Sequence, residues 1–178
     1  MQAQPISLSI IVPVYNNSRD LKECLSAIMA ASPSNTEIIV VDDASTDDTF
    51  PTASGLRVRT LQLEKNSGVA AARNYGACHA RGEILFFVDA DVVIPPGAVK
   101  RLMEVFEGNP ALAAVFGSYD VQPRAKGTVS QYRNLLHHFV HQKGNTEAST
   151  FWAGCGAVRR RAFENIGVSQ IPAPLPGS

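Results

Sequence analysis

The chain has 178 residues, a length that fits one domain with a substantial buried core. Its 16 Lys and Arg residues balance 16 Asp and Glu residues, so no overall charge favours nucleic acid or another charged polymer as a partner. The three cysteines are widely spaced and form no Cys-x-x-Cys pair. This argues against a disulfide framework and a zinc site, and favours small buried side chains in a reducing compartment.

Apolar segments of strand length alternate with helical segments, which predicts an α/β fold with a doubly wound, mostly parallel sheet. The first apolar segment, residues 6–14, is too short to span a bilayer and lacks a basic flank, so we predict a buried strand. Further strands are expected at residues 37–43, 58–63, 83–93 and 112–121. Helices are expected at about residues 18–29, 68–81 and 96–107, the first capped by Asn17 or Ser18.

Beyond residue 121 the pattern changes to a loop, a helical segment at 129–142 and a glycine-broken strand at 150–158. The last seven residues contain three prolines. We therefore expect one domain over residues 1–167 and an irregular tail over 168–178.

Ligands of open parallel sheets bind at the carboxyl ends of the strands, so polar residues after each apolar segment are the candidate site residues. The first segment ends in PVYNN rather than a glycine-rich turn, and neither a GxGxxG nor a GxxxxGK motif occurs. A dinucleotide fold or a phosphate loop thus loses its main support. The second segment ends in Asp42 and Asp43 before Ala-Ser-Thr. This pattern is as typical of a helix cap as of a ligand site.

Asp89 and Asp91 follow the apolar run ILFFV and lie two residues apart. In a strand both carboxylates would point to one side, an arrangement that a hard divalent cation such as Mg²⁺ or Mn²⁺ would stabilise. The alternative is a solvated turn with two unpaired aspartates.

Residues 66–76, NSGVAAARNYG, lead from a loop into an alanine-rich helix. Small residues let this helix pack closely on the sheet, while Arg73 and Asn74 can donate to a base, ribose or phosphate. Taken alone, the segment is more typical of a surface arginine on a tightly packed helix.

Five segments in order, over residues 7–167, closely resemble the family-two glycosyltransferases of the GT-A fold. The resemblance implies a nucleoside-diphosphate sugar donor, a divalent metal ion (Mn²⁺ or Mg²⁺) and inversion at the anomeric carbon. The five segments are SIIVPVYNN, EIIVVDDASTDDT, NSGVAAARNYG, EILFFVDADVVIPPG and FWAGCGAVRRRAFENIG.

The resemblance also implies a role for individual residues. Asp91 would ligate the metal, with Asp89 beside it and close to the ribose and sugar. Asp43 would meet the base. The implied donor-binding residues are Pro13, Tyr15, Asp42, Asp43, Asn66, Gly68, Arg73, Asp89 and Trp152.

The resemblance ends at Gly167, and no Asp or Glu follows Glu164. The family's acidic motif that supplies the catalytic base therefore has no counterpart, and the catalytic residue stays unassigned. We favour a fragment or altered C-terminus of a longer enzyme over a substitute base. His137 and His141 have a spacing that would permit metal binding or proton transfer, although a packed or acceptor-facing helix is the favoured interpretation.

Two further features near the end of the match have open roles. Trp152 would stack on a sugar ring or fill the core, and the nearby glycines favour the former. Residues 159–161, all arginine, would hold a diphosphate or lipid phosphate, or begin a solvated helix.

The expected function is metal-dependent transfer of a sugar, with inversion, from a nucleoside-diphosphate sugar to a glycan, lipid-linked or small-molecule acceptor. The rival is a donor-binding domain that binds nucleotide and metal without turnover. A nucleotidyltransferase would show a glycine-rich basic loop where this chain has PVYNN. Absent export signals and unpaired cysteines predict a cytoplasmic location, with peripheral association at the inner face of a membrane left open.

Overall fold

The computed structural model describes residues 7–117 and 153–165. Within these ranges six strands form one sheet in the order β3-β2-β1-β4-β6-β5. The pairs β1–β2, β2–β3 and β1–β4 are parallel, whereas β6 runs antiparallel to β4 and β5. The strands are β1 (Leu8–Val14), β2 (Glu37–Asp42), β3 (Arg59–Gln62), β4 (Ile84–Val88), β5 (Ala114–Phe116) and β6 (Cys155–Arg159).

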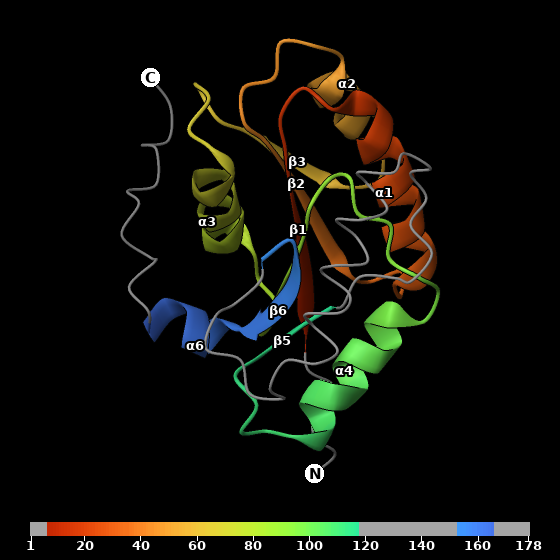
Figure 1. Cartoon of the computed structure of the whole chain (residues 1–178), viewed down its shortest axis with the longest axis vertical. Helices are drawn as coiled ribbons and strands as arrows, with labels where there is room; N and C mark the ends of the chain where they lie inside the picture. Colours follow the sequence, from red (N-terminus) through yellow and green to blue (C-terminus); the bar gives the residue numbers. More distant parts are fainter. Residues whose placement is uncertain (1–6, 118–152, 166–178) are drawn as a thin grey trace, which may run out of the picture.

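Helices cover both faces of this sheet, so the predicted doubly wound α/β fold is confirmed (Figure 1). α1 and α4 pack on one face and α3 packs with α6 on the other. None of the helices in the described ranges is long and apolar enough to cross a membrane. The helices are α1 (Ser18–Ala31), α2 (Thr49–Ser54), α3 (Val69–His79), α4 (Ala98–Gly108) and α6 (Arg160–Asn165).

The central strands carry long apolar runs because both of their faces are buried, and the one polar residue inside β1, Ser9, is hydrogen-bonded. In β1, Ile10 and Val12 pack toward α1, while Ile11 packs toward α3. All five residues of β4 are buried. The first helix has the predicted cap, since the Asn17 side chain accepts from the amide of Asp20 at 3.4 Å.

α3 lies unusually close to the sheet. A Cβ atom at Gly76 would come within 2.5 Å of Ile11 Cγ2 and 2.9 Å of Val41 Cγ2. The alanines that flank this contact, Ala72 and Ala77, are buried as well. Small side chains therefore permit the close packing that the alanine-rich sequence predicts.

The structure corrects two of these sequence predictions and adds one helix. The strand expected over residues 83–93 ends at Val88, because the Val92 amide donates to the Asp89 carbonyl and turns the chain. The helix α2 was not predicted, since its sequence TFPTAS has no apolar period. Cys78 is exposed rather than buried. The predicted helix at residues 129–142 and the tail lie outside the described residues.

Candidate functional site

The loops that follow β1, β2 and β4 meet the start of α3 at the carboxyl edge of the parallel strands (Figure 1). This is the edge at which open α/β sheets bind ligands. The polar residues that follow these strands, which the sequence singles out as candidate site residues, therefore lie at one edge of the sheet.

The loops after β1 and β2 are bonded into one unit. The Asn16 amide donates to Ser45 Oγ at 2.9 Å, and the Thr46 amide donates to Asn16 Oδ1 at 2.8 Å. Two residues take left-handed backbone conformations, Asn16 with φ 48° and Ala44 with φ 60°. Tyr15 projects from this unit and is 48% exposed. The loop unit therefore presents an aromatic surface on a backbone that is fixed by hydrogen bonds.

Asp43 joins this loop unit to α3. Its side chain is buried, and its two oxygens accept from the amides of Ser67 at 2.7 Å and Gly68 at 2.8 Å. The carboxylate thus lies at the N-terminus of α3, where a negative charge complements the helix dipole. The helix-cap alternative does not hold in the predicted form, because Asp43 binds two amides that precede α3 and caps no helix that follows it directly.

Asp42 has a structural environment of its own. It is fully buried at the end of β2 and accepts from the amide of Ser45 at 3.2 Å and from Gln62 Nε2 at 2.8 Å. These contacts shape the loop after β2 and tie it to β3.

The main chain of Asp89 is held by three other segments. Its amide donates to the Gly154 carbonyl at 2.9 Å, and its carbonyl accepts from the Val92 amide at 2.9 Å and from Cys24 Sγ at 3.6 Å. Its carboxylate accepts from Arg73 Nη2 at 2.5 Å. The backbone and side chain of Asp89 are therefore both fixed before any ligand binds.

Asp91 differs from Asp89 in its exposure and in its contacts. It lies in the turn after β4, is exposed, and has no hydrogen bond or ion pair with any residue in the described ranges. The prediction that both carboxylates extend from one strand is wrong, and Arg73 supplies a positive partner for only one of them.

These two carboxylates are the groups that could hold a divalent cation. Within residues 7–117 and 153–165, no cluster of three or more His, Cys, Asp or Glu side chains is arranged as a metal site. Mg²⁺ and Mn²⁺ commonly bind one or two protein carboxylates and complete their coordination with water and substrate phosphate. The exposed oxygens of Asp91, next to the partly exposed Asp89, fit that mode of binding.

The thiols of Cys24 and Cys155 lie next to the turn that carries these aspartates. Burial, helped by the nearby negative charges of Asp91 and Asp89, raises the pKa of Cys24 to about 12. Burial and the charge of Asp89 raise the pKa of Cys155 to about 11. Both groups are therefore neutral thiols at physiological pH and act as packing and weak donor groups rather than as nucleophiles.

The remaining predicted residues fall into different environments. Pro13 is buried within β1, where it pairs with Val41. Asn66 and Gly68 are exposed at the start of α3, and Gly68 has φ 87°. Trp152 lies outside the described residues, as do His137 and His141.

Of the three consecutive arginines, Arg159 ends β6 whereas Arg160 and Arg161 begin α6, and the guanidinium groups of all three bind main-chain carbonyls. Arg159 donates to the carbonyls of Leu112 and Phe106, Arg160 to that of Gly82, and Arg161 to that of Pro110. Arginine donors thus fasten the last strand and helix to earlier segments. The sequence pattern alone carried no signal for these carbonyl partners.

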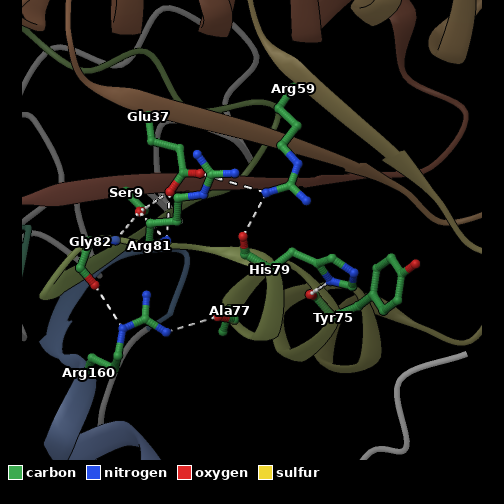
Figure 2. A network of polar contacts seen from close by, with 9 residues as sticks. All are labelled: Ser9, Glu37, Arg59, Tyr75, Ala77, His79, Arg81, Gly82 and Arg160. Carbon is green, nitrogen blue, oxygen red and sulfur yellow. Dashed lines mark hydrogen bonds and ion pairs between the residues drawn. The ribbon is translucent and has the colours of Figure 1, made fainter. Parts of the chain in front are cut away.

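A second polar network lies at the amino edge of the sheet. Figure 2 shows Ser9 and Glu37 around the turn that joins α3 to β4, where Ser9 Oγ accepts from the Gly82 amide at 2.7 Å and Glu37 from the Arg81 amide at 2.7 Å. A hollow of about 960 Å³ beside it is lined partly by Glu37, Arg81 and α4. This hollow is remote from the carboxyl-edge cluster, and we assign it no part in the chemistry.

Comparison with known proteins places this geometry in a family. The protein-family model described as glycosyl transferase family 2 matches residues 9–167 of the sequence. The chain is 34% identical over 117 residues to the glycosyltransferase GlyG of Streptococcus pneumoniae, which covers 63% of this chain and 38% of that protein. It is 33% identical over 136 residues to the dolichol-phosphate mannosyltransferase of Pyrococcus furiosus, which covers 74% of this chain and 38% of that protein.

A solved structure gives the same answer for the fold. The mannosyltransferase PcManGT from Pyrobaculum calidifontis, in complex with GDP-Man and Mn²⁺, matches with a TM-score of 0.68 and 26% identity, over 93% of this chain and 48% of that chain. The chain therefore spans less than half the length of each of these proteins. The GT-A fold expected from the sequence is confirmed, and with a family match over most of its length the chain belongs to glycosyl transferase family 2.

Proposed function

We propose that this chain forms the donor-binding part of an enzyme that transfers a sugar from a nucleoside-diphosphate sugar to an acceptor, with inversion and with Mn²⁺ or Mg²⁺. One observation carries the proposal: at the carboxyl edge of the sheet, a fixed Asp89 lies two residues from Asp91, which is exposed and has no partner among residues 7–117 and 153–165. The complex of PcManGT with GDP-Man and Mn²⁺ supports both the donor class and the metal.

Each residue of the site has a proposed part. Asp91 would hold the metal, which supplies electrostatic stabilisation to the departing diphosphate. Asp89 would accept hydrogen bonds from the ribose or the sugar, since its second carboxylate oxygen is not used by Arg73. Tyr15 would contact the nucleoside, and Asp43 would keep the start of α3 in place beside it.

Attack by an acceptor hydroxyl needs a base on the face opposite the leaving diphosphate. The name of the Pyrococcus relative supports a lipid phosphate acceptor. A lipid-linked acceptor would agree with peripheral association at the inner face of a membrane, which the predicted cytoplasmic location leaves open.

The first test is calorimetric titration of the chain with UDP and with GDP, each with and without Mn²⁺, followed by a donor-hydrolysis assay on the nucleotide that binds. Metal-dependent binding is the expected result, because the proposed donor-binding residues lie within this chain. Turnover would show in addition that the chain is active by itself, whereas binding without turnover would identify it as a donor-binding domain that does not act alone. A folded chain that binds neither nucleotide would refute the proposed site.

Asp91→Ala tests the metal assignment. We expect it to abolish the Mn²⁺-dependent part of nucleotide affinity while the melting temperature stays unchanged, because the side chain is exposed and unpaired among the described residues. The matched control is Asp48→Ala, which removes an equal charge from an exposed side chain that caps no amide of α2. Unchanged metal dependence in Asp91→Ala would remove this residue from its role.

A further inference from the structure

The guanidinium group of Arg73 is directed at Asp89. Arg73 Nη2 lies 2.5 Å from Asp89 Oδ1, and the two side chains are 18% and 35% exposed. The Nε atom of Arg73 is buried and has no hydrogen-bond partner among residues 7–117 and 153–165. Within these ranges the carboxylate of Asp89 is thus the group that holds the end of the Arg73 side chain.

Asp89 in turn has little freedom apart from the rotation of its side chain. Hydrogen bonds from its amide and to its carbonyl fix its backbone on both sides. The remaining variable is the direction of the two carboxylate oxygens, and the ion pair with Arg73 sets it. Oδ1 is occupied by the guanidinium, which leaves Oδ2 for a ligand.

The helix that carries Arg73 is itself fixed at both ends. Asp43 binds the two amides that precede its first turn. At its other end, Arg59 donates to the His79 carbonyl at 2.7 Å and Arg160 to the Ala77 carbonyl at 3.3 Å (Figure 2). Arg73 therefore reaches Asp89 from a helix that hydrogen bonds hold at both ends, not from a loop.

We propose that Arg73 is a positioning residue that acts on the nucleotide sugar through Asp89, not by its own contact with the nucleotide. This inference rests on the proposed function. Arg73 holds Asp89 in the orientation that accepts from the donor, and it neutralises the charge of Asp89. Of the two aspartates in the turn after β4, Asp91 is then the one that offers an uncompensated carboxylate to the metal. The competing arrangement is direct binding, in which a nucleotide oxygen reaches the buried Nε of Arg73.

A double-mutant cycle separates these two arrangements. The variants are Arg73→Gln, Asp89→Asn and the double variant, titrated calorimetrically with UDP and GDP in the presence of Mn²⁺. We expect each single variant to bind about tenfold more weakly, the effect of one charge-assisted hydrogen bond. If Arg73 acts through Asp89, the double variant binds as weakly as Asp89→Asn alone.

Arg73→Lys adds a test whose result differs between a positioning role and a purely structural role of Arg73. Lysine keeps the charge without the fork of donors, so we expect it to restore part of the affinity in the presence of Asp89 and none in the Asp89→Asn background. Arg57→Gln, which removes the same charge from an exposed loop position, is the matched control and should bind as the unaltered chain does. Melting temperatures are recorded for all variants.

The outcomes are distinct. Losses that multiply to about a hundredfold in the double variant would show direct binding and overturn the inference while leaving the proposed function intact. A loss in Arg73→Gln that follows the melting temperature, without rescue by Arg73→Lys, would overturn it in favour of a structural role. An unaltered chain that is folded and binds neither nucleotide would overturn both the inference and the proposed function.

Discussion

Replacement of Gly76 by alanine tests whether close packing of α3 on the sheet controls the site. The new Cβ would lie 2.5 Å from Ile11 Cγ2 and 2.9 Å from Val41 Cγ2, whereas carbon atoms in contact are separated by about 3.5–4.0 Å. Both neighbours are β-branched and fully buried, so their rotamers cannot change cheaply. α3 must therefore move away from the sheet, by up to about 1 Å, to restore an ordinary contact distance.

The magnitude follows from two opposing effects. Overpacking of this kind costs about 2–3 kcal/mol, while alanine in place of glycine in a helix returns about 1 kcal/mol. We therefore expect Gly76→Ala to lower the free energy of unfolding by about 1–2 kcal/mol and the melting temperature by about 2–8 °C. Because Arg73 lies one turn before Gly76, the same displacement should weaken nucleotide binding at temperatures where the chain is folded.

Denaturant titration and calorimetric nucleotide titration measure the two effects. Gly108→Ala is the control, because a Cβ at the end of α4 meets nothing within 4 Å and should stabilise the chain slightly. A Gly76→Ala variant that is as stable as Gly108→Ala would refute the packing argument. Lower stability with unchanged nucleotide affinity would show that α3 can move without affecting the site.

Four further predictions concern other parts of the structure. Asp43→Asn loses one of the two hydrogen bonds that Asp43 accepts from main-chain amides, so we expect the free energy of unfolding to fall by about 1–3 kcal/mol in denaturant titration. Nucleoside binding without metal should become weaker as well. A loss of stability without a loss of nucleoside affinity would limit the role of Asp43 to holding α3. Ala44→Gly relieves a left-handed backbone with φ 60° and should raise the free energy of unfolding by about 0.5–1 kcal/mol, and no gain would argue against this strain. At pH 8 a thiol reagent should label the exposed Cys78 first, with Cys24 and Cys155 reacting only on unfolding. Because their folded pKa values of about 12 and 11 exceed the ordinary 9.0, the folded state keeps protons that the unfolded chain releases. Stability should accordingly be complete below pH 9 and fall as the pH rises toward 11–12, less steeply in Cys24→Ala.

Continuous apolar runs predicted the central strands well because those strands are buried on both faces. The same reasoning extended β4 too far. Val92 and Val93 continue the apolar run after Asp89, but the chain turns at Asp89 and Val92 packs against the core from a loop. Composition cannot distinguish an apolar residue in a strand from one in a buried loop.

The location of the candidate site was predictable from the sequence, whereas the hydrogen bonds and ion pair between its residues were not. Parallel strands bring their carboxyl ends to one edge, and this rule alone gathers the loops after β1, β2 and β4. The partners Arg73 and Asp89 are 16 residues apart, and Asp43 and Ser67 are 24 apart. Such contacts depend on the rotation and height of α3 over the sheet, which its weak amphipathic pattern does not encode.

Charges at both ends of α3 explain how that rotation and height are set. Asp43 places a carboxylate at the N-terminus, and the guanidinium groups of Arg59 and Arg160 lie against carbonyls at the C-terminus, an arrangement that complements the helix dipole at each end. Arg160 also donates to the Gly82 carbonyl at 2.9 Å, so it fixes the helix relative to the turn that leads into β4. β4 is the strand that ends in Asp89. The two partners of the ion pair in the site are therefore aligned with each other by contacts at the opposite edge of the sheet.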